Sequence, residues 1–383
     1  MKMMGEDRPL KILRVAQVQR NRIGGMSRTL FLTGDVLQAL GHSVDYWFEE
    51  DLKVALPPQL WRFVAPWKLW RRLAAELRRG TCWDIVEFHE PIGAFLTALP
   101  IGSTRTVALS YGLEERSRLA SLEYRQRAHL PVSFKERYSP LTVVWQAQRS
   151  VRHADHVLCS NSIDVRHLVN EGVDPTRVTR HFSGVESVFL KTDFRPAESR
   201  SGILFVGTWI DRKGIREIRP AVSALLREDS KLTFTAAGTG ISEGQVLEGF
   251  DPILRHRIRV IPKIEGSDTL IRLYGEHAVL VLASYFEGHP LVLVEAAAQG
   301  LPAVGTDIGG ISDFITHEQD GLIIAVAAPL ELEAALRRML KNPELRNRFG
   351  TALRLKARGF TWEASARNIE AAFRTTLRQN HRR

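Results

Sequence analysis

Short apolar runs alternate along the chain with longer stretches in which apolar residues recur every three or four positions. This pattern is typical of strands and helices in a parallel α/β sheet. The first run leads to the glycine pair Gly24-Gly25, a helical stretch that ends near Leu40, and a second run. The apolar runs predict strands at 11–18, 43–48, 84–88, 106–110 and 156–160, and then at 203–206, 232–236, 259–261, 278–282 and 302–305.

The pattern weakens between Arg180 and Arg200, which indicates a domain boundary. We therefore expect two doubly wound parallel-sheet α/β domains in tandem, over residues 1–188 and 189–362. From Trp362 the chain continues as a polar-faced helical stretch.

Composition narrows the class of protein. The 383 residues are 44% apolar and 25% charged, which excludes disordered and fibrous proteins. The two cysteines, Cys82 and Cys159, form no Cys-x-x-Cys pair, so we expect a reducing compartment and no four-ligand structural zinc site. The polar, acidic start and the lack of a long apolar run argue against a signal peptide and a spanning helix, so we expect a cytoplasmic protein.

Positive charge is concentrated in the first half of the chain. The net charge is +10, and residues 1–185 contribute 26 − 19 = +7 of it. Residues 59–80 hold six basic residues and one acidic residue. We expect Pro66 to open a helix there, with one apolar face made of Trp67, Trp70, Leu73, Ala74 and Leu77. Such a helix packs on its own domain or lies in a membrane interface. The sequence has no basic motif interleaved with aromatic residues, so we do not expect it to bind nucleic acid.

The segment 283–315 holds the strongest candidate chemistry. A strand ends at Leu282, a turn follows at Glu287-Gly288-His289, and Pro290 suits the first position of a helix that runs to about Gln299. Gly300 is placed for a left-handed residue after that helix. The backbone N–H groups of 288–292, which include Leu291, therefore predict an anion site at the carboxyl edge of the sheet.

Two carboxylates flank this predicted anion site. Glu287 lies in the turn and Glu295 in the second turn of the helix. Both can accept hydrogen bonds from sugar or ribose hydroxyls. The alternative is a helix cap with one exposed glutamate.

Glu287-x7-Glu295 and the following GLPAVGTDIGGISDFI resemble glycosyltransferase family 4, whose members are retaining enzymes of the GT-B fold that use nucleotide sugars. Other segments also resemble this family, and they are VGTWIDRKG at 206–214, AGTG at 237–240, DGL at 320–322, NPELR at 342–346 and FTWE at 360–363.

The resemblance implies a GT-B fold with two Rossmann-like domains and a role for each matching residue. The first domain binds the acceptor, the second binds the donor, and a final helix at about 363–383 returns to the first domain. Glu295 would hold the ribose, and Glu287 would hold the donor sugar with help from the amides of 288–291. Lys213 would neutralise the leaving diphosphate, with Arg212 beside it. The loops at Gly24-Gly25 and at Gly238 and Gly240 would lie close to the donor.

Two positions depart from the family pattern. Many members have arginine after the glycine of the phosphate loop, where this chain has Thr208, and Arg212 is a candidate substitute. Many members also have histidine where this chain has Tyr111. Tyrosine is a poor base at neutral pH, and His89 is the nearest imidazole in the sequence of that domain.

The resemblance implies transfer of a sugar from a nucleotide diphosphate to an acceptor hydroxyl with retention. The chain has no Asp-x-Asp pair, so we expect chemistry without a metal or another cofactor. The acceptor is expected to be a glycan or a lipid-linked glycan, as in cell-surface polysaccharide synthesis, and 59–80 would bind the anionic inner face of the cytoplasmic membrane. The alternatives are a catalytically weak sugar-nucleotide-binding or scaffold protein and a nucleotide-sugar epimerase of similar fold.

Overall fold

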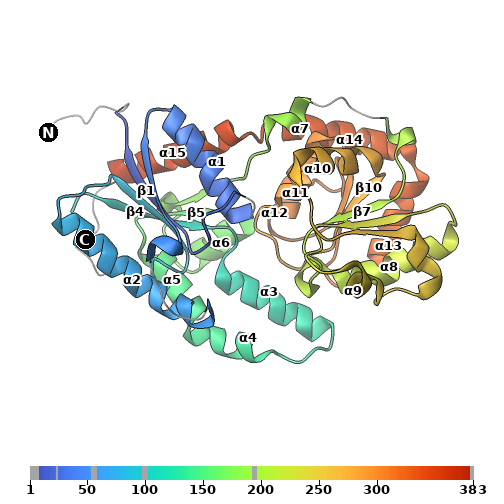
Figure 1. Cartoon of the computed structure of the whole chain (residues 1–383), viewed down its shortest axis with the longest axis horizontal. Helices are drawn as coiled ribbons and strands as arrows, with labels where there is room; N and C mark the ends of the chain where they lie inside the picture. Colours follow the sequence, from blue (N-terminus) through green and yellow to red (C-terminus); the bar gives the residue numbers. More distant parts are fainter. Residues whose placement is uncertain (1–7, 23–24, 53–57, 97–101, 192–195, 380–383) are drawn as a thin grey trace. The chain divides into compact units, whose positions relative to one another are not determined.

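The structure is a computed structural model that describes residues 8–22, 25–52, 58–96, 102–191 and 196–379. The chain divides into two compact units. Unit 1 is Met1–Leu122, Pro131–Ser183 and Trp362–Arg383, and unit 2 is Glu123–Leu130 and Gly184–Thr361. Each unit has its own six-stranded sheet in which every pairing is parallel (Figure 1). Two α/β domains of this kind were expected from the sequence, and the fold class is confirmed.

The sheet of unit 1 has the strand order β2-β1-β3-β4-β5-β6. Its strands are β1 (Lys11–Val15), β2 (Ser43–Trp47), β3 (Ile85–His89), β4 (Arg105–Ser110), β5 (His156–Cys159) and β6 (Val178–Arg180). Its helices are α1 (Gly25–Ala39), α2 (Pro58–Arg78), α3 (Glu114–Arg127), α4 (Phe134–Tyr138), α5 (Val143–His153), α6 (Ser162–Asn170) and α15 (Trp362–Arg378), although the end of α3 belongs to unit 2.

Both faces of this sheet are covered by helices, which explains why its central strands are continuous apolar runs. On one face, Leu69 and Leu73 of α2 join the core with Phe88. On the other face, Phe373 of α15 is fully buried in a cluster with Ile12 of β1. The final helix is therefore part of the core of unit 1.

The sheet of unit 2 has the strand order β12-β11-β10-β7-β8-β9. Its strands are β7 (Ile203–Val206), β8 (Phe234–Ala237), β9 (Ile258–Ile261), β10 (Val279–Leu282), β11 (Ala303–Thr306) and β12 (Leu322–Ile324). Its helices are α7 (Ser187–Lys191), α8 (Ile215–Glu228), α9 (Glu243–Leu247), α10 (Gly266–Glu276), α11 (Leu291–Ala298), α12 (Gly309–Phe314), α13 (Pro329–Lys341) and α14 (Pro343–Ala357).

The helix in the basic segment differs from the expectation in two respects. Pro66 lies inside α2, which begins at Pro58, so the expectation that Pro66 opens the helix was wrong. Its ring removes one helical hydrogen bond, and the buried Ala65 and Leu69 on either side hold this turn on the core. The predicted apolar face is correct at Leu73 and Ala74, which are buried, and at Leu77, which packs on the core. It was wrong at Trp67, which is 44% exposed, with the Arg71 guanidinium over its ring.

No helix in the described ranges is long and apolar enough to cross a membrane.

Candidate functional site

Two loops at the carboxyl edge of the sheet in unit 2 pack against each other. One follows β7 and ends at Gly214, and the other follows β10 and begins at Ala283. The Tyr285 N–H donates to the carbonyl of Arg212 at 3.0 Å, and Arg212 Nη1 donates to the carbonyl of Phe286 at 2.9 Å. Gly214 has φ 73°, and a Cβ there would lie 2.0 Å from the carbonyl oxygen of Ala283. Glycine therefore permits the close approach of the two loops.

This approach brings three of the predicted site residues together. Lys213 Nζ donates to Glu287 Oε1 in a short ion pair, and Arg212 Nη1 lies 3.7 Å from Glu287 Oε2. Ser284 Oγ also donates to Glu287 at 2.8 Å. Burial by itself would raise the pKa of Glu287, but Lys213 and Arg212 outweigh it and hold this pKa below its usual range. The site thus joins two cations to one ionised, buried carboxylate.

Helix α11 starts beside this cluster. Pro290 is its N-cap and Leu291 its first residue, so the expected start at Pro290 was one position early. The first turn of any helix has N–H groups without an intrahelical acceptor, and the helix dipole favours anions there. A Cβ on Gly310 would lie 2.2 Å from the carbonyl oxygen of Gly288 and 2.8 Å from Cα of His289, so α12 packs closely on the turn. Gly300 has φ 62°, which confirms the expected left-handed residue after α11.

The second predicted carboxylate lies deeper in unit 2. Glu295 is 1% exposed, and its Oε2 accepts a hydrogen bond from the hydroxyl of Tyr274 at 3.1 Å. The tyrosine comes from α10, so α10 and α11 together position this carboxylate.

The glycine-rich turns after β7 and β8 are neighbours. The Gly207 N–H donates to the carbonyl of Ala237 at 2.9 Å, and the Trp209 N–H donates to that of Thr239 at 2.9 Å. A Cβ on Gly240 would lie 3.5 Å from the methyl carbon of Thr208. Gly238 and Gly240 both have φ 70°, which a side chain would disfavour. Thr208 and these two glycines therefore line one part of the carboxyl edge.

In unit 1 the predicted residues lie at the carboxyl ends of β3 and β4. The ring of His89 stacks on that of Tyr111, with centroids 5.6 Å apart. Burial lowers the pKa of His89 to about 4 and raises the pKa of Tyr111. Both side chains are therefore neutral near pH 7. Gly25 is the first residue of α1, and Gly24 lies outside the described residues.

The sequence reasoning missed two buried titratable groups in this cluster. His181 follows β6, and its ring meets that of Tyr111 edge-on at 5.7 Å. Burial lowers the pKa of His181 to about 4. Glu90 accepts from Ser110 Oγ at 2.9 Å, and burial, with the nearby Glu114, raises its pKa to about 8. Both residues directly follow a strand, and polar residues at this position lie at the carboxyl edge of a parallel sheet, where ligands bind. This position in the sequence could have identified them.

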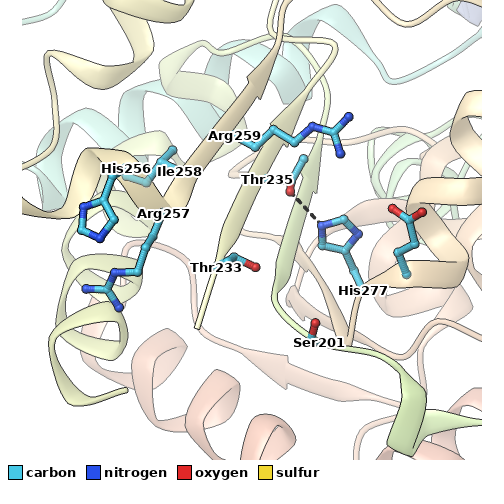
Figure 2. Close-up of a pocket in the computed structure, with 9 residues that line it drawn as sticks. Ser201, Thr233, Thr235, His256, Arg257, Ile258, Arg259 and His277 are labelled. Carbon is cyan, nitrogen blue, oxygen red and sulfur yellow. Dashed lines mark hydrogen bonds between the residues drawn. The ribbon is translucent and has the colours of Figure 1, made fainter. Parts of the chain in front are cut away.

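A separate hollow of about 300 Å³ lies at the opposite, amino-terminal edge of the sheet in unit 2 (Figure 2). Arg257 Nη1 donates to the carbonyl of Asp229 at the end of α8. His277 Nδ1 donates to the carbonyl of Leu273 in the last turn of α10. Donors at such positions satisfy the free carbonyls of helix C-termini, so these side chains act as helix caps. The hollow is distinct from the candidate site.

Comparisons with known proteins agree with this fold. Residues 190–356 match the family model for glycosyl transferases group 1. A D-inositol 3-phosphate glycosyltransferase of Nocardioides sp. is 27% identical over 59% of this chain and 55% of the relative. A glycogen synthase of Mycobacterium tuberculosis is 29% identical over 56% of this chain and 53% of the relative. The chain thus spans about half the length of these relatives.

Solved structures show the same fold. Sucrose-phosphate synthase from Thermosynechococcus elongatus has a TM-score of 0.75 at 17% identity, covering 95% of this chain and 98% of the other. HepE of Anabaena in complex with UDP has a TM-score of 0.66 at 13% identity, covering 94% of this chain and 99% of the other. These likenesses confirm the expected GT-B fold, and the match of residues 190–356 to glycosyl transferases group 1 supports the expected resemblance to glycosyltransferases.

Proposed function

We propose that this protein transfers a sugar from a nucleotide diphosphate donor to an acceptor hydroxyl, with retention and without a metal. One observation carries the proposal. Lys213 and Arg212 converge on Glu287 beside the start of α11, so cationic groups, a helix N-terminus and a carboxylate share one edge of the sheet. The cationic groups and the helix N-terminus can bind a diphosphate, and the carboxylate can accept a hydrogen bond from a sugar hydroxyl.

The residues act by positioning and by charge. Lys213 and Arg212 would neutralise the diphosphate as its bond to the sugar breaks, which is the step at which negative charge develops. Glu287 would accept from the donor sugar, and Glu295 would accept from the ribose. The acceptor would attack from the face that the diphosphate leaves, so the anomeric configuration is retained.

The residues of unit 1 support transfer of the acceptor's hydroxyl proton to the diphosphate of the donor rather than to a protein side chain. The low pKa of His89 and His181 makes each a weak base, and the raised pKa of Tyr111 keeps its phenol protonated. The departing diphosphate is then the base that takes the proton of the acceptor.

A thermal-shift panel of nucleoside diphosphates and their sugars tests donor binding. The complex of the structural neighbour HepE with UDP makes UDP and UDP-glucose the first ligands to try. We expect nucleotides with one particular nucleobase to raise the melting temperature of the protein. We also expect turnover to be unchanged when EDTA is added. The absence of a shift with every nucleotide would contradict the proposal.

The alternatives differ in their products. A transferase releases the nucleotide diphosphate slowly from the donor alone and faster when an acceptor is added. A binding or scaffold protein releases none, and an epimerase converts the donor sugar without releasing its nucleotide. The neutral Thr208 in the phosphate loop is the feature that makes this comparison necessary.

We further propose a glycan or lipid-linked acceptor at the inner face of the cytoplasmic membrane. The support is the net positive charge of the first half of the chain, the exposed Trp67, Arg71 and Arg78 of α2, and the exposed Arg79 directly after that helix. Basic residues near an anionic leaflet contribute about 1 kcal/mol each. Co-sedimentation with anionic vesicles at low and high salt tests this electrostatic binding to the membrane. Binding that does not weaken at high salt would contradict it.

A further inference from the structure

A second surface of unit 1 exposes large apolar side chains. Leu141 is 79% exposed and Phe134 is 78% exposed, and Val132, Tyr138 and Trp145 are 55%, 46% and 44% exposed. We call these five side chains the α4 surface. Elsewhere on the described chain the exposed large apolar side chains are scattered, apart from Phe63 and Trp67, which lie four residues apart in α2 and are 43% and 44% exposed. The concentration of the five α4-surface side chains within residues 132–145 indicates a surface that contacts something other than water.

The fold holds the α4 surface in place. Glu136 of α4 accepts from the N–H and Oγ of Ser133 at 2.9 and 2.6 Å, and from Ser121 Oγ of α3. Arg118 Nε donates to the Glu136 carbonyl at 3.0 Å. These contacts tie the polar side of α4 to α3 (Figure 1). The rings of Phe134 and Tyr138, one turn apart, meet with centroids at 4.3 Å.

The core of unit 1 does not use these side chains. Val143, Val144, Ala147 and Val151 of α5 are buried and already supply the core-facing side of that helix. Trp145 lies outside that side, with the guanidinium of Arg149 5.9 Å from its ring centroid. The five side chains of the α4 surface are therefore left outside the core of unit 1.

The segment that carries the α4 surface has a positive net charge. Residues 132–153 hold Lys135, Arg137, Arg149 and Arg152 against Glu136, a net of 4 − 1 = +3, and Arg152 is paired with Glu171 outside this segment. The hydrogen bonds described above engage the carboxylate of Glu136. Aromatic and aliphatic side chains beside arginines are the composition that lies at the headgroup layer of an anionic bilayer.

We propose that the α4 surface is where this protein lies on an anionic lipid bilayer, with its apolar side chains at the boundary between headgroups and acyl chains. This deepens the membrane part of the proposed function, because it moves the apolar contact from α2 to α4. In α2 the side chains of Ala65, Leu69 and Leu73 are already buried in unit 1, and the large apolar side chains that its described part exposes are Phe63 and Trp67, against five on the α4 surface. A stable dimer needs about 1,200–2,000 Å² of buried surface, more than five partly exposed side chains supply.

The test is flotation of the full chain with phosphatidylcholine vesicles that contain or lack phosphatidylglycerol. We expect binding only with phosphatidylglycerol. The variant Phe134→Ser/Leu141→Ser should lower the partition coefficient about tenfold, because it removes the two most exposed apolar groups. The matched control is Ile253→Ser/Leu355→Ser, which changes two residues of unit 2 that are 70% and 67% exposed and should bind as the unaltered chain does.

Two outcomes would overturn the inference. The first is equal binding by the unaltered chain and the Phe134→Ser/Leu141→Ser variant, or no binding to either vesicle. The second is a dimer in light scattering that the variant abolishes, which would make a second copy the occupant. The melting shift with UDP separates this inference from the proposed donor site. Both variants should keep that shift, and its absence from the unaltered chain would count against the donor site alone.

Discussion

Lys213 has a structural role as the partner of the buried Glu287 and a proposed catalytic role at the leaving phosphate. We predict that Lys213→Ala lowers kcat by a factor that corresponds to about 2–4 kcal/mol, the effect of removing one preorganised charge-stabilising group. The free energy of unfolding should also fall, but by less than the loss of about 3–5 kcal/mol that follows when a buried ion pair is broken, because Arg212 and Ser284 still contact the buried Glu287. Steady-state kinetics and urea unfolding measure the two effects.

The control is Lys263→Ala, which breaks an ion pair with Glu265 in which both side chains are largely exposed. Such pairs contribute about 0–1 kcal/mol, so both measurements should stay close to the original values. If Lys213→Ala loses less than tenfold in kcat, Arg212 carries the charge.

Glu295 is predicted to act on binding rather than on turnover. Glu295→Ala should weaken the affinity for the nucleotide, measured by calorimetry, because it removes a proposed acceptor for the ribose hydroxyls. Tyr274→Phe keeps the carboxylate and removes only the hydroxyl that donates to it, so it should change affinity much less. Equal losses of affinity in the two variants would show that the pair acts only through stability.

Glu90 predicts a dependence of stability on pH. Its folded pKa of about 8 lies above its ordinary value, so the folded state holds a proton that the unfolded state has lost between about pH 4.5 and 8. The free energy of unfolding attributable to Glu90 therefore falls as the pH rises through this window, by at most about 1.4 kcal/mol per unit. Unfolding in urea at pH 6 and pH 9 should show this fall.

Glu90→Gln should remove this fall while keeping an acceptor for Ser110. Below about pH 6.5, His89, His156 and His181 act in the opposite direction, because each has a folded pKa of about 4 and stays neutral while the unfolded chain takes up protons. A fall between pH 6 and pH 9 that persists in Glu90→Gln would assign it to another group.

Among the elements, the turn at Gly214 controls how the two loops of unit 2 meet. Gly214→Ala should lower the free energy of unfolding by more than about 2 kcal/mol, since it adds a clash with Ala283 to the cost of a left-handed conformation. Gly266→Ala is the matched control. Gly266 has φ 75° with nothing within 4 Å of the added Cβ, so only the cost of about 1–2 kcal/mol for the conformation remains. Equal losses would contradict the clash.

The sequence could predict elements far better than the contacts between them. The buried apolar runs of β7 and β10 were expected near their observed positions, whereas β6 and β12 were missed because three residues carry too little pattern. Helix α2 was misjudged because tertiary packing overrides the preference of Pro66. Such packing is not visible in local periodicity.

The candidate site shows the same limit. Glu287 and Lys213 were both predicted to act on the donor, but their ion pair was not predicted. They lie 74 residues apart and meet because β7 pairs with β10. His181 and Glu90 were missed because burial, which sets their pKa, depends on the whole of unit 1.

At the scale of the whole molecule, the two units should respond separately to core mutations. Phe373→Ala in α15 should destabilise unit 1 by about 3–5 kcal/mol, because it removes a fully buried ring from the cluster around β1. Phe349→Ala in α14 should do the same to unit 2. Calorimetric scans measure the two transitions, and UDP identifies that of unit 2 by raising it.

We expect Phe373→Ala to move the first transition and Phe349→Ala to move the second. If both variants move a single shared transition, the two units unfold as one cooperative body.

The position of α15 also sets an order of events during synthesis. The ribosome makes the six strands of unit 1 first, then the part of unit 2 from Gly184 to Thr361, and only afterwards the helix that supplies Ala366, Ile369 and Phe373 to the core of unit 1. Unit 2 from Gly184 onward is complete in the nascent chain at Thr361. Unit 1 therefore starts first and finishes last, and the part of its apolar sheet face that α1 does not cover stays exposed until α15 leaves the exit tunnel. A nascent chain stalled before α15 should be the species that chaperones bind.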